Sequence, residues 1–368
     1  MSYDIAIVGA GIAGASLAAE VAPHARVVLL EAEDQAGYHA TGRSAAFWSE
    51  TYGGAGVQPL TTASGAALRD GGFLEPLGSL HIGREADRAA YDGFLAEFAH
   101  SGIALTSVDP HAHVAGLRAE WTLGIWEPSC AYIDVAALHA DCLARARRAG
   151  ATVRTRAALR RAERAGARWR IDTADGGLVE ADILVDAAGA WADEVARAAG
   201  ATPIGIAAFR RTLVQLRTDP PTAPGMPHVA AIDGSFYWKP EAGGKLWLSP
   251  HDEIPTDPCD AQPEELDVAI AIDRLEHAVD WRIMGVERKW AGLRSFAPDR
   301  LPVYGFAPGT PGFFWFAGQG GFGIQTAPAA AMIGASLLLG QPPDAAVAGI
   351  DPVRYTPSRF DVAGQGTA

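Results

Sequence analysis

Residues 3–33 read YDIAIVGAGIAGASLAAEVAPHARVVLLEAE and contain three consecutive structural patterns. The apolar run 3–9 is typical of a strand that is buried on both faces of a parallel sheet. Small residues at 11–22 predict a closely packed helix, and the apolar run 26–32 predicts a second strand. This stretch therefore predicts a strand–helix–strand unit at the start of an α/β fold.

Three glycines, Gly9, Gly11 and Gly14, lie where the first strand meets the helix, and Glu31 ends the second strand. In a dinucleotide-binding unit such glycines permit a tight turn, a close backbone approach to a pyrophosphate and close helix–strand packing. The helix N-terminus offers N–H groups to phosphate, and the acid accepts ribose hydroxyls. An acid here disfavours a 2′-phosphate, which leaves FAD or NAD. The alternative is a glycine-rich turn beside a surface glutamate.

Further strands and helices of the same kind are predicted in the middle and near the end of the chain. The apolar runs 181–188 and 312–317 predict two more buried strands, and 325–339 predicts a helix. A helix at 263–279 accompanies shorter β-type runs, and together they indicate an inserted antiparallel sheet. These runs are 212–217, 229–232, 235–239 and 246–249.

The predicted fold class is therefore α/β, in a two-domain α+β arrangement. A discontinuous Rossmann-like dinucleotide domain carries an inserted antiparallel-sheet domain that binds substrate. The last stretch, 356–368, is expected to form a solvated tail. The first domain is assigned to 1–75, 130–205 and 300–368, and the second to 76–129 and 206–299.

The composition excludes several function classes. The chain has 368 residues, 49% of them hydrophobic, which is enough for a sizeable core. The net charge of −13 offers no basic face to nucleic acid. The charge-free segment 301–341 is interrupted by prolines and glycines, so no transmembrane helix is expected. Because the N-terminus lacks the basic start of a signal peptide, a cytoplasmic protein is expected.

No metal site is predicted. The three cysteines, Cys130, Cys142 and Cys259, form no CxxC pair, so they indicate neither a disulfide framework nor a zinc site. His111 and His113 lie two apart in a loop rich in Pro and Ala and lack a third ligand.

Two further motifs are rich in small residues. Residues 37–46 read GYHATGRSAA and offer small, polar and cationic groups where a second half of the cofactor could lie. Thr41, Arg43 and Ser44 can donate to phosphate or flavin oxygens. Residues 317–326 read AGQGGFGIQT at a strand–helix junction, where N–H groups can stabilise negative charge. Read alone, each motif could be an ordinary surface loop or flexible turn.

Taken in order, these motifs resemble those of the D-amino-acid-oxidase-like (DAO) flavoproteins. The resemblance rests on the segments VGAGIAGAS, LLEAE, GYHATGRSAA, DILVDAAGAW, WAGLRSFAPD and FAGQGGFGIQT. The resemblance runs from about Tyr3 to Leu339 and is greatest to bacterial FAD-dependent dehydrogenases of the D-arginine type. It implies that FAD is the cofactor. Since residues 40–46 contain no histidine or cysteine, non-covalent attachment is expected.

The resemblance also implies which residues contact FAD. Residues of the first motif match the ADP-binding fingerprint, 40–47 match the segment around the pyrophosphate and flavin, and 320–325 match the loop over the pyrimidine end. The predicted cofactor-binding residues are Gly9, Gly11, Ala13, Gly14, Glu31, Ala32, Ala40, Thr41, Gly42, Arg43, Ser44, Ala45, Ala46, Phe47, Leu159, Ala188, Gly189, Trp191, Gly320, Gly321, Phe322, Gly323, Ile324 and Gln325.

For the substrate, the family pattern implies an α-carboxylate held by arginine and tyrosine. The matching positions are Arg211, Tyr237 and Arg294, with Tyr52 closing the cavity. A guanidinium stays charged at any working pH and presents a fork of donors that suits a carboxylate. Strand alternation puts Arg210 and Arg211 on opposite faces, so only one of them can point at the flavin.

The chain departs from the arginine-type pattern at two positions. Ser79 falls where that pattern has an acid facing the cationic side chain, and Phe47 stands where it has a histidine. Both changes favour an apolar substrate side chain, although Glu75 or Glu85 could still supply the acid. A run of acids between Asp252 and Glu265 is expected to be a solvated face.

The resemblance implies an FAD-dependent enzyme that oxidises the Cα–N bond of a D-amino acid. Hydride would pass to flavin N5, and the resulting imino acid would hydrolyse to a 2-oxo acid and ammonia. Glycine, sarcosine or another secondary amine is the alternative substrate, and a non-catalytic FAD-binding subunit is a second alternative. The sequence leaves oxygen and quinone open as the electron acceptor.

Overall fold

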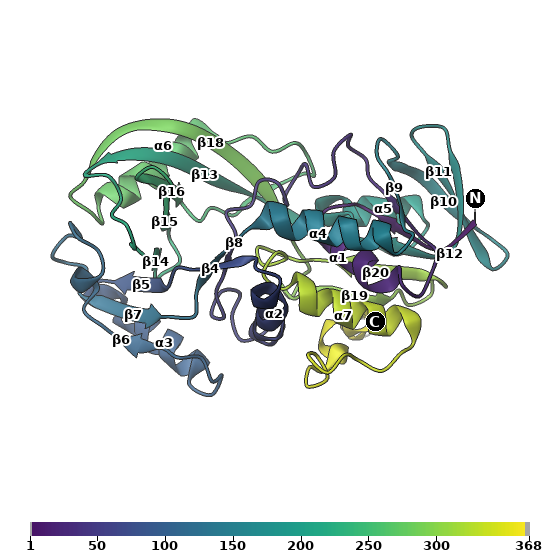
Figure 1. Cartoon of the computed structure of the whole chain (residues 1–368), viewed down its shortest axis with the longest axis horizontal. Helices are drawn as coiled ribbons and strands as arrows, with labels where there is room; N and C mark the ends of the chain where they lie inside the picture. Colours follow the sequence, from purple (N-terminus) through teal and green to yellow (C-terminus); the bar gives the residue numbers. More distant parts are fainter. Residues whose placement is uncertain (1, 365–368) are drawn as a thin grey trace.

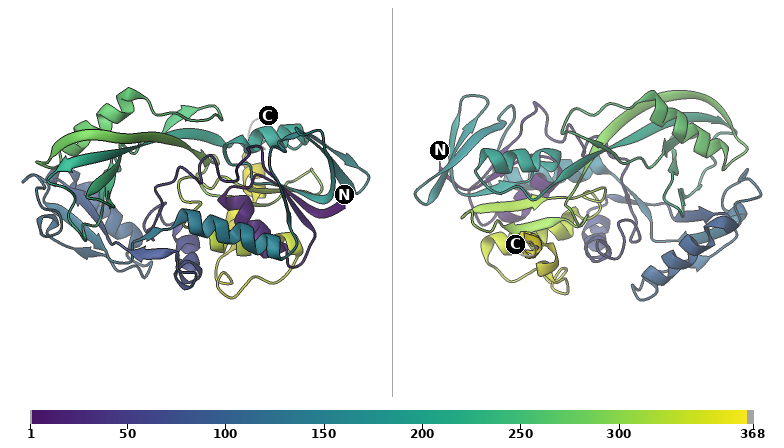
Figure 2. Two further views of the ribbon diagram at one scale, coloured as in Figure 1. Left: turned by 45° about the horizontal axis from the view of Figure 1, so that its top comes forward. Right: turned by 180° about the vertical axis from the view of Figure 1, so that it is seen from behind.

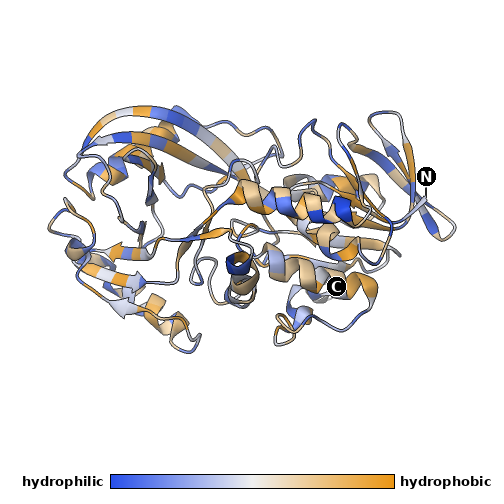
Figure 3. Cartoon of the chain, in the orientation of Figure 1, coloured by the Kyte–Doolittle hydropathy of each residue, from blue (hydrophilic) through white to orange (hydrophobic). Residues whose placement is uncertain are grey.

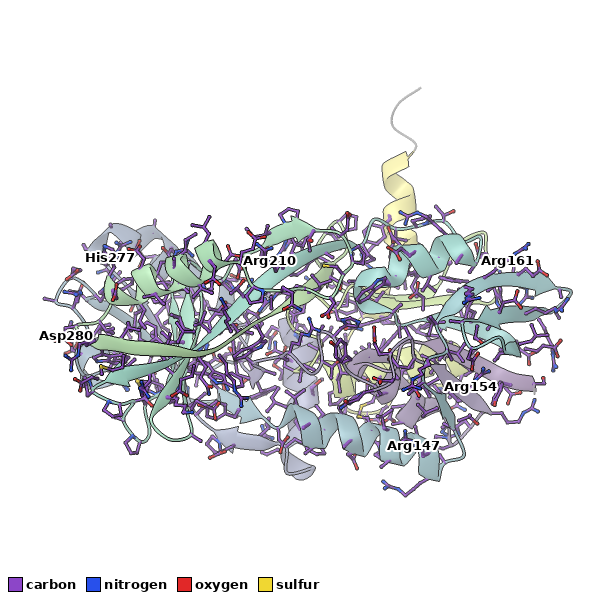
Figure 4. All side chains as sticks on the ribbon, turned by 90° about the horizontal axis from the view of Figure 1, so that it is seen from above. Arg147, Arg154, Arg161, Arg210, His277 and Asp280 are labelled. Carbon is purple, nitrogen blue, oxygen red and sulfur yellow. The ribbon has the colours of Figure 1, made fainter. Side chains whose placement is uncertain are left out.

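The computed structural model describes residues 2–364, with side chains through Phe360. Its elements form two lobes along the longest axis, one built on an eight-stranded sheet and the other on a nine-stranded sheet (Figure 1). His277, at the end of one lobe, and Arg161, in the outer hairpin of the other, lie toward opposite ends of the molecule in Figure 4. This mixed α/β architecture confirms the predicted fold class.

The eight-stranded sheet contains the predicted strand–helix–strand unit at its centre. Strand β1 pairs in parallel with both β12 and β2, and β12 pairs in parallel with β20. The strands are β1 (Ser2–Val8), β2 (Val27–Leu30), β9 (Thr152–Arg154), β10 (Leu159–Ala165), β11 (Arg168–Thr173), β12 (Leu178–Asp186), β19 (Val303–Phe306) and β20 (Phe313–Ala317).

Helices cover both faces of this sheet because alternate residues of β1 point to opposite sides. Ile5 and Ile7 pack under one group of helices, and Ala6 and Val8 pack toward α5. On α4, hydrophilic and apolar residues are interleaved in Figure 3, since part of its surface covers α1. The helices are α1 (Ile12–Val21), α4 (Val135–Arg148), α5 (Ala192–Ala198) and α7 (Ala327–Leu339).

The nine-stranded sheet forms the second lobe. Its strands are β5 (Ser79–Gly83), β6 (Thr106–Ser107), β7 (Leu123–Glu127), β13 (Ala207–Asp219), β14 (His228–Ala231), β15 (Tyr237–Glu241), β16 (Lys245–Ser249), β17 (Ile254–Thr256) and β18 (Arg282–Phe296). Strands β15 and β16, which correspond to the predicted runs 235–239 and 246–249, pair antiparallel as expected. Figure 2 shows β13 and β18 running as a long pair from this lobe to the other.

The remaining elements join or flank the two lobes. Helix α6 (Glu265–Glu276) packs on β13 and β16. Between the lobes lie β3 (Phe47–Trp48), β4 (Leu74–Pro76) and β8 (Ala131–Ile133), which form a small third sheet. The other helices are α2 (Gln58–Asp70), α3 (Arg88–Phe98) and the 3₁₀ segments η1 (Glu85–Asp87), η2 (Pro110–Ala112), η3 (Gly189–Trp191), η4 (Pro352–Tyr355) and η5 (Pro357–Gly364).

The expected solvated tail needs a correction. Residues 357–364 form the 3₁₀ segment η5. Arg359 pairs with Asp299 at 2.7 Å, and Phe360 packs against the core of the first lobe. This part of the tail is therefore docked, and the rest of it, 365–368, lies outside the described residues. The domain boundaries between 75 and 76, 129 and 130, 205 and 206, and 299 and 300 stay predictions.

Across the described residues, no helix combines the length and the apolar character that crossing a bilayer requires.

Candidate cofactor and substrate site

One cavity brings together residues from all three small-residue motifs and both lobes. It runs from the carboxyl ends of β1 and β2, across 37–47, to β13, β15 and β18. Every predicted site residue lines this cavity except Gly14 and Gly42. The prediction missed several lining residues, among them Ile12, Gly37, His39, Ala187, Leu213, Gly292, Leu293, Ser295 and Gln319.

The first glycine motif packs helix α1 tightly on β1. A Cβ at Gly14 would lie 1.9 Å from the carbonyl oxygen of Gly9, so Gly14 serves packing and lies behind the cavity wall. Gly9 has a φ of +98°, a conformation that side chains disfavour. Gly11 caps α1 without a side-chain hydrogen bond, and Thr41 Oγ1 accepts from the Ile12 N–H at 3.0 Å.

Glu31 is buried at the end of β2 and faces the cavity. Its carboxylate accepts from the backbone N–H of Ala10 at 2.9 Å and from that of Glu33 at 3.0 Å. These bonds hold the acid beside the glycine turn, while each oxygen keeps a lone pair for a ribose hydroxyl.

The structure corrects two expectations for the 37–46 loop. The Arg43 guanidinium points away from the cofactor position, because it donates to the carbonyls of Ala261 and Ala291 and pairs with Asp260. Gly42 also faces outward, since its N–H closes a turn onto the Gly37 carbonyl at 2.7 Å. These bonds hold the 37–46 loop to the second lobe and occupy the Arg43 guanidinium, while Arg43 still lines the cavity and its contact with FAD stays a prediction.

The 317–326 motif supplies a wall of bare backbone. A Cβ at Gly321 would lie 2.2 Å from Nη1 of Arg294 and 2.5 Å from the hydroxyl of Tyr52, so a side chain there would displace this pair. Gln319 Nε2 is buried without a hydrogen-bond partner among the described residues, while its Oε1 accepts from Tyr304. An unpaired amide donor at the cavity wall suits a carbonyl-bearing ligand.

The second lobe contributes the four predicted substrate residues. Arg211 comes from β13, Tyr237 from β15 and Arg294 from β18, and all three line the cavity with Tyr52. Arg210, labelled in Figure 4, faces the opposite side of β13 and pairs with Asp267 of α6 at 2.8 Å. The alternation argument for these two arginines is thus confirmed.

Arg211 is buried, with one donor nitrogen to spare. Its Nε donates to the Asp252 carbonyl at 2.5 Å and its Nη2 to Glu253 at 3.4 Å. Its Nη1 is buried without a partner among the described residues. Burial and the charge of Arg294 lower the pKa of Arg211. A ligand carboxylate would relieve both effects.

The acids between Asp252 and Glu265 were expected to form a solvated face, and this is only partly correct. Asp257, Asp260, Glu264 and Glu265 are exposed, but Asp252 and Glu253 are half-buried, and several of these acids form ion pairs. Asp252 accepts from the Thr212 N–H, and Glu253 bridges Arg211 to Arg300. Burial raises the pKa of Asp252. Asp260 and Glu264 hold Arg43 and Arg210. These ion pairs join segments distant in sequence, which is why a local charge pattern could not reveal them.

Arg294 is held by a phenol and has no carboxylate ion pair among the described residues. Its Nη1 donates to the hydroxyl of Tyr52. Burial lowers the pKa of Arg294, but Tyr52 and Tyr237 outweigh that effect and the net shift is upward. The site thus presents a fixed positive charge between two phenols.

The far end of this site is apolar. Phe47 lines the cavity and packs on the ring of His228, with ring centroids 4.1 Å apart. Ser79 is fully buried behind it and bonds to His228 Nδ1 at 2.9 Å. Glu75 and Glu85 are both exposed, and Glu85 pairs with Arg88. Within residues 2–364 the only acids on the cavity wall are Glu31 and Glu33, near the glycine turn.

Comparison with protein families identifies a family to which this chain is similar along most of its length. Residues 4–337 match the model of the DAO family, described as FAD dependent oxidoreductase. The chain belongs to this family. FAD is accordingly its cofactor, and the general resemblance drawn from the motifs is confirmed.

Individual relatives do not support the narrower resemblance to D-arginine dehydrogenases. Glycine oxidase from Pseudomonas aeruginosa is 27% identical over 188 residues, which is 50% of this chain and 47% of that protein. Glycine oxidase from Pseudomonas putida is 29% identical over 192 residues, or 51% of this chain and 48% of that protein. The matched part of the chain spans about half the length of these curated relatives.

Solved structures share the whole fold at low sequence identity. L-proline dehydrogenase from P. horikoshii superposes with a TM-score of 0.85 at 20% identity, covering 98% of each chain. Glycine oxidase from Geobacillus kaustophilus gives 0.82 at 21% identity, covering 97% of this chain and 99% of the other. At such identities the comparison establishes the fold alone.

The residues of the cavity fit FAD. The glycine turn and Glu31 lie where an ADP half needs them, and the bare backbone at Gly320 and Gly321 admits a planar ring system. The unpartnered Gln319 amide is a donor for its carbonyl groups. When bound, FAD would accept two electrons from the substrate in the form of a hydride.

Non-covalent attachment of FAD is a testable consequence. Of the cavity-lining residues in the described chain, His39 is the one with an imidazole or thiol, and its Nε2 bonds to Glu33 at 2.9 Å. Acid precipitation of the purified protein should therefore leave the yellow colour in the supernatant. Colour retained in the washed pellet would contradict this expectation.

Proposed function

We propose that this protein oxidises the Cα–N bond of an amino acid, with preference for an apolar D-amino acid. The observation that supports this most is the group formed by Arg211, Arg294, Tyr52 and Tyr237 on the cavity wall. Two guanidiniums and two phenols around one point match a single carboxylate. A site that merely stored FAD would not need this group.

The charges around the two arginines favour one carboxylate rather than two. Asp252 and Glu253 lie 3.7 and 3.4 Å from Arg211 and offset its charge, whereas Arg294 is held by a phenol. One bound carboxylate therefore neutralises the remaining positive charge. The free Nη1 of Arg211 supplies the additional hydrogen bond.

The protein's own contribution to the reaction is orientation. Arg294 and Arg211 fix the carboxylate, Tyr52 and Tyr237 restrict rotation about it, and Phe47 limits the space for the side chain. Holding the donor carbon about 3–3.5 Å from its acceptor is the alignment that accelerates such a transfer. The amine must arrive uncharged, and the product is an imino acid that hydrolyses in water to a 2-oxo acid and ammonia.

The apolar far end predicts the side-chain preference. A guanidinium or ammonium group next to Phe47 would lose its hydration without gaining an acid partner, because Glu75 and Glu85 are exposed and neither lines the cavity. D-Leu, D-Met or D-Phe would instead bury apolar area at about 25 cal/mol per Å². The value of kcat/KM for D-Leu should exceed that for D-Arg by about tenfold or more, a difference of about 1.4 kcal/mol.

That comparison uses one enzyme preparation and saturating electron acceptor for both substrates. A tenfold preference for D-Arg would contradict the proposal, because an acid from another segment would then have to face the pocket.

Glycine or a secondary amine such as sarcosine is the second candidate substrate. The similarity to two glycine oxidases favours it, and the carboxylate site would serve both candidates. A small substrate would leave the space beside Phe47 unfilled. Ammonia and 2-oxo acid production from glycine, sarcosine, D-Leu and L-Leu distinguishes the cases, with highest activity expected on D-Leu. Activity on glycine or sarcosine alone would favour the second candidate.

A further inference from the structure

Glu127 is a fully buried carboxylate at the end of β7 that does not line the cavity. Such a group is stable only where hydrogen bonds replace its lost hydration. His81 and Ser129 lie at 3.5 Å from this carboxylate, and its three shorter hydrogen bonds come from consecutive residues. Their donors are the N–H of Glu50 at 2.8 Å, the hydroxyl of Thr51 at 2.7 Å and the hydroxyl of Ser49 at 3.0 Å.

These three donors immediately precede Tyr52, one of the substrate residues. Ser49 and Thr51 also bond to each other at 3.1 Å, and the Tyr52 N–H donates to the Ser49 carbonyl at 3.2 Å. The segment is therefore a tight turn gathered around one anion. Its position relative to β7 depends on the Glu127 carboxylate.

Gln325 holds the same turn from the opposite side. Its Oε1 accepts from the Ser49 N–H at 3.2 Å, and its Nε2 donates to the Tyr52 carbonyl at 2.9 Å and to Thr61 at 2.9 Å. The backbone of residues 49–52 is thus clamped between a carboxylate of the second lobe and an amide of the flavin-side loop. The phenol at the end of this clamped turn is the group that holds Arg294.

The charge of Glu127 matters as well as its size. Burial raises the pKa of Glu127, but the hydrogen bonds from His81, Thr51 and Ser49 outweigh it and the net shift is downward. The group is therefore an anion at neutral pH. A glutamine in its place would present one acceptor oxygen and bring an NH₂ toward donors that need an acceptor.

We propose that Glu127 is the positioning residue that sets Tyr52 against Arg294 and thereby tunes the affinity for the substrate carboxylate. It acts through the 49–52 turn and touches neither FAD nor substrate. The proposal rests on the proposed function in taking a carboxylate as the group that Tyr52 and Arg294 bind.

A double-mutant cycle tests the proposal in the holoenzyme. Tyr52→Phe should raise KM for the preferred amino acid by about tenfold, and Glu127→Gln by about fivefold with kcat within about twofold. If Glu127 acts through Tyr52, the double variant should match Tyr52→Phe alone. Fully additive effects on KM, or an unchanged KM in Glu127→Gln, would overturn it.

Two further variants separate positioning from loss of stability. Thr51→Val removes the shortest hydrogen bond from the turn itself and should raise KM by about two- to threefold. Asp175→Asn is the control, because Asp175 also accepts from an N–H and a hydroxyl, those of Gly177 and Thr173, in a turn that neither lines the cavity nor contacts residues 49–52. It should leave KM unchanged.

Hydrogen exchange of the 49–55 amides needs no substrate and keeps this proposal separate from the proposed function. Exchange should accelerate by about tenfold in Glu127→Gln and remain at the wild-type rate in Asp175→Asn. Faster exchange in a protein that oxidises no amine would retain the positioning role and refute the substrate assignment. Unchanged exchange would refute the positioning role.

Discussion

Arg294→Ala should lower kcat/KM for an amino-acid substrate by at least about 30-fold, and by up to a few thousandfold. Removing one partner of a buried charge pair costs about 2–5 kcal/mol, which corresponds to this range. Arg294 has the phenol of Tyr52 as its side-chain partner and projects into the cavity, so the substrate carboxylate would lose its main cation. Steady-state kinetics on the FAD-loaded variant measures the loss.

A pair of neighbouring arginines provides the control. Arg211→Ala should show a loss of the same kind, whereas Arg210→Ala breaks ion pairs to Glu264 and Asp267 on the other face of β13. The Arg210 variant should therefore keep kcat/KM within about threefold of wild type. FAD content should stay near wild type in all three variants. Equal losses for Arg210→Ala and Arg211→Ala would mean that general damage to β13 explains both.

Gly14→Ala is expected to abolish FAD binding. The added methyl would lie 1.9 Å from the Gly9 carbonyl oxygen, and this neighbour is backbone that cannot rotate away. Helix α1 would have to shift from β1, which costs about 1–3 kcal/mol or more and moves the N–H groups that face the cofactor. The ratio of flavin to protein absorbance after purification, together with Tm, measures the effect.

Gly93→Ala is the matched control for a glycine within a helix. Gly93 lies in α3, and nothing lies within 4 Å of a Cβ built there. This change should leave FAD content unchanged and raise stability by about 0.5–1 kcal/mol, because alanine favours a helix. Normal FAD content in Gly14→Ala would show that the close helix–strand contact is dispensable.

The parts of the fold that could be predicted from sequence are those specified by local patterns. The buried runs at β1, β2, β12 and β20 are short and apolar, so their strands could be placed to within a few residues. The glycine motif identified the cofactor class because each glycine answers a local steric demand. The docked tail could not be predicted, because it depends on tertiary contacts such as that of Arg359 with Asp299, 60 positions earlier in the chain.

The candidate site shows the same division. Strand alternation predicted that only one of Arg210 and Arg211 could face the cavity, and the family resemblance selected Arg211. The direction of the Arg43 guanidinium could not be predicted from the sequence, since its partners Asp260 and the Ala261 carbonyl lie more than 200 residues further along the chain. Glu127 and Gln325 both bond to the 49–52 turn, from opposite sides. No local sequence pattern predicts that these two residues contact the same turn. Side-chain partners across lobes depend on tertiary packing, which single-sequence periodicity does not encode.

Anaerobic mixing of the FAD-loaded protein with amino acids tests the central claim most directly. Visible flavin absorbance is recorded with D-Leu, L-Leu, D-Arg, glycine and sarcosine, each in the wild type and in Arg294→Ala. We expect D-Leu to bleach the wild-type absorbance fastest, with a rate that saturates as its concentration rises, and Arg294→Ala to need far more substrate for the same rate. Absorbance that none of these compounds bleaches would contradict the proposed amino-acid oxidation.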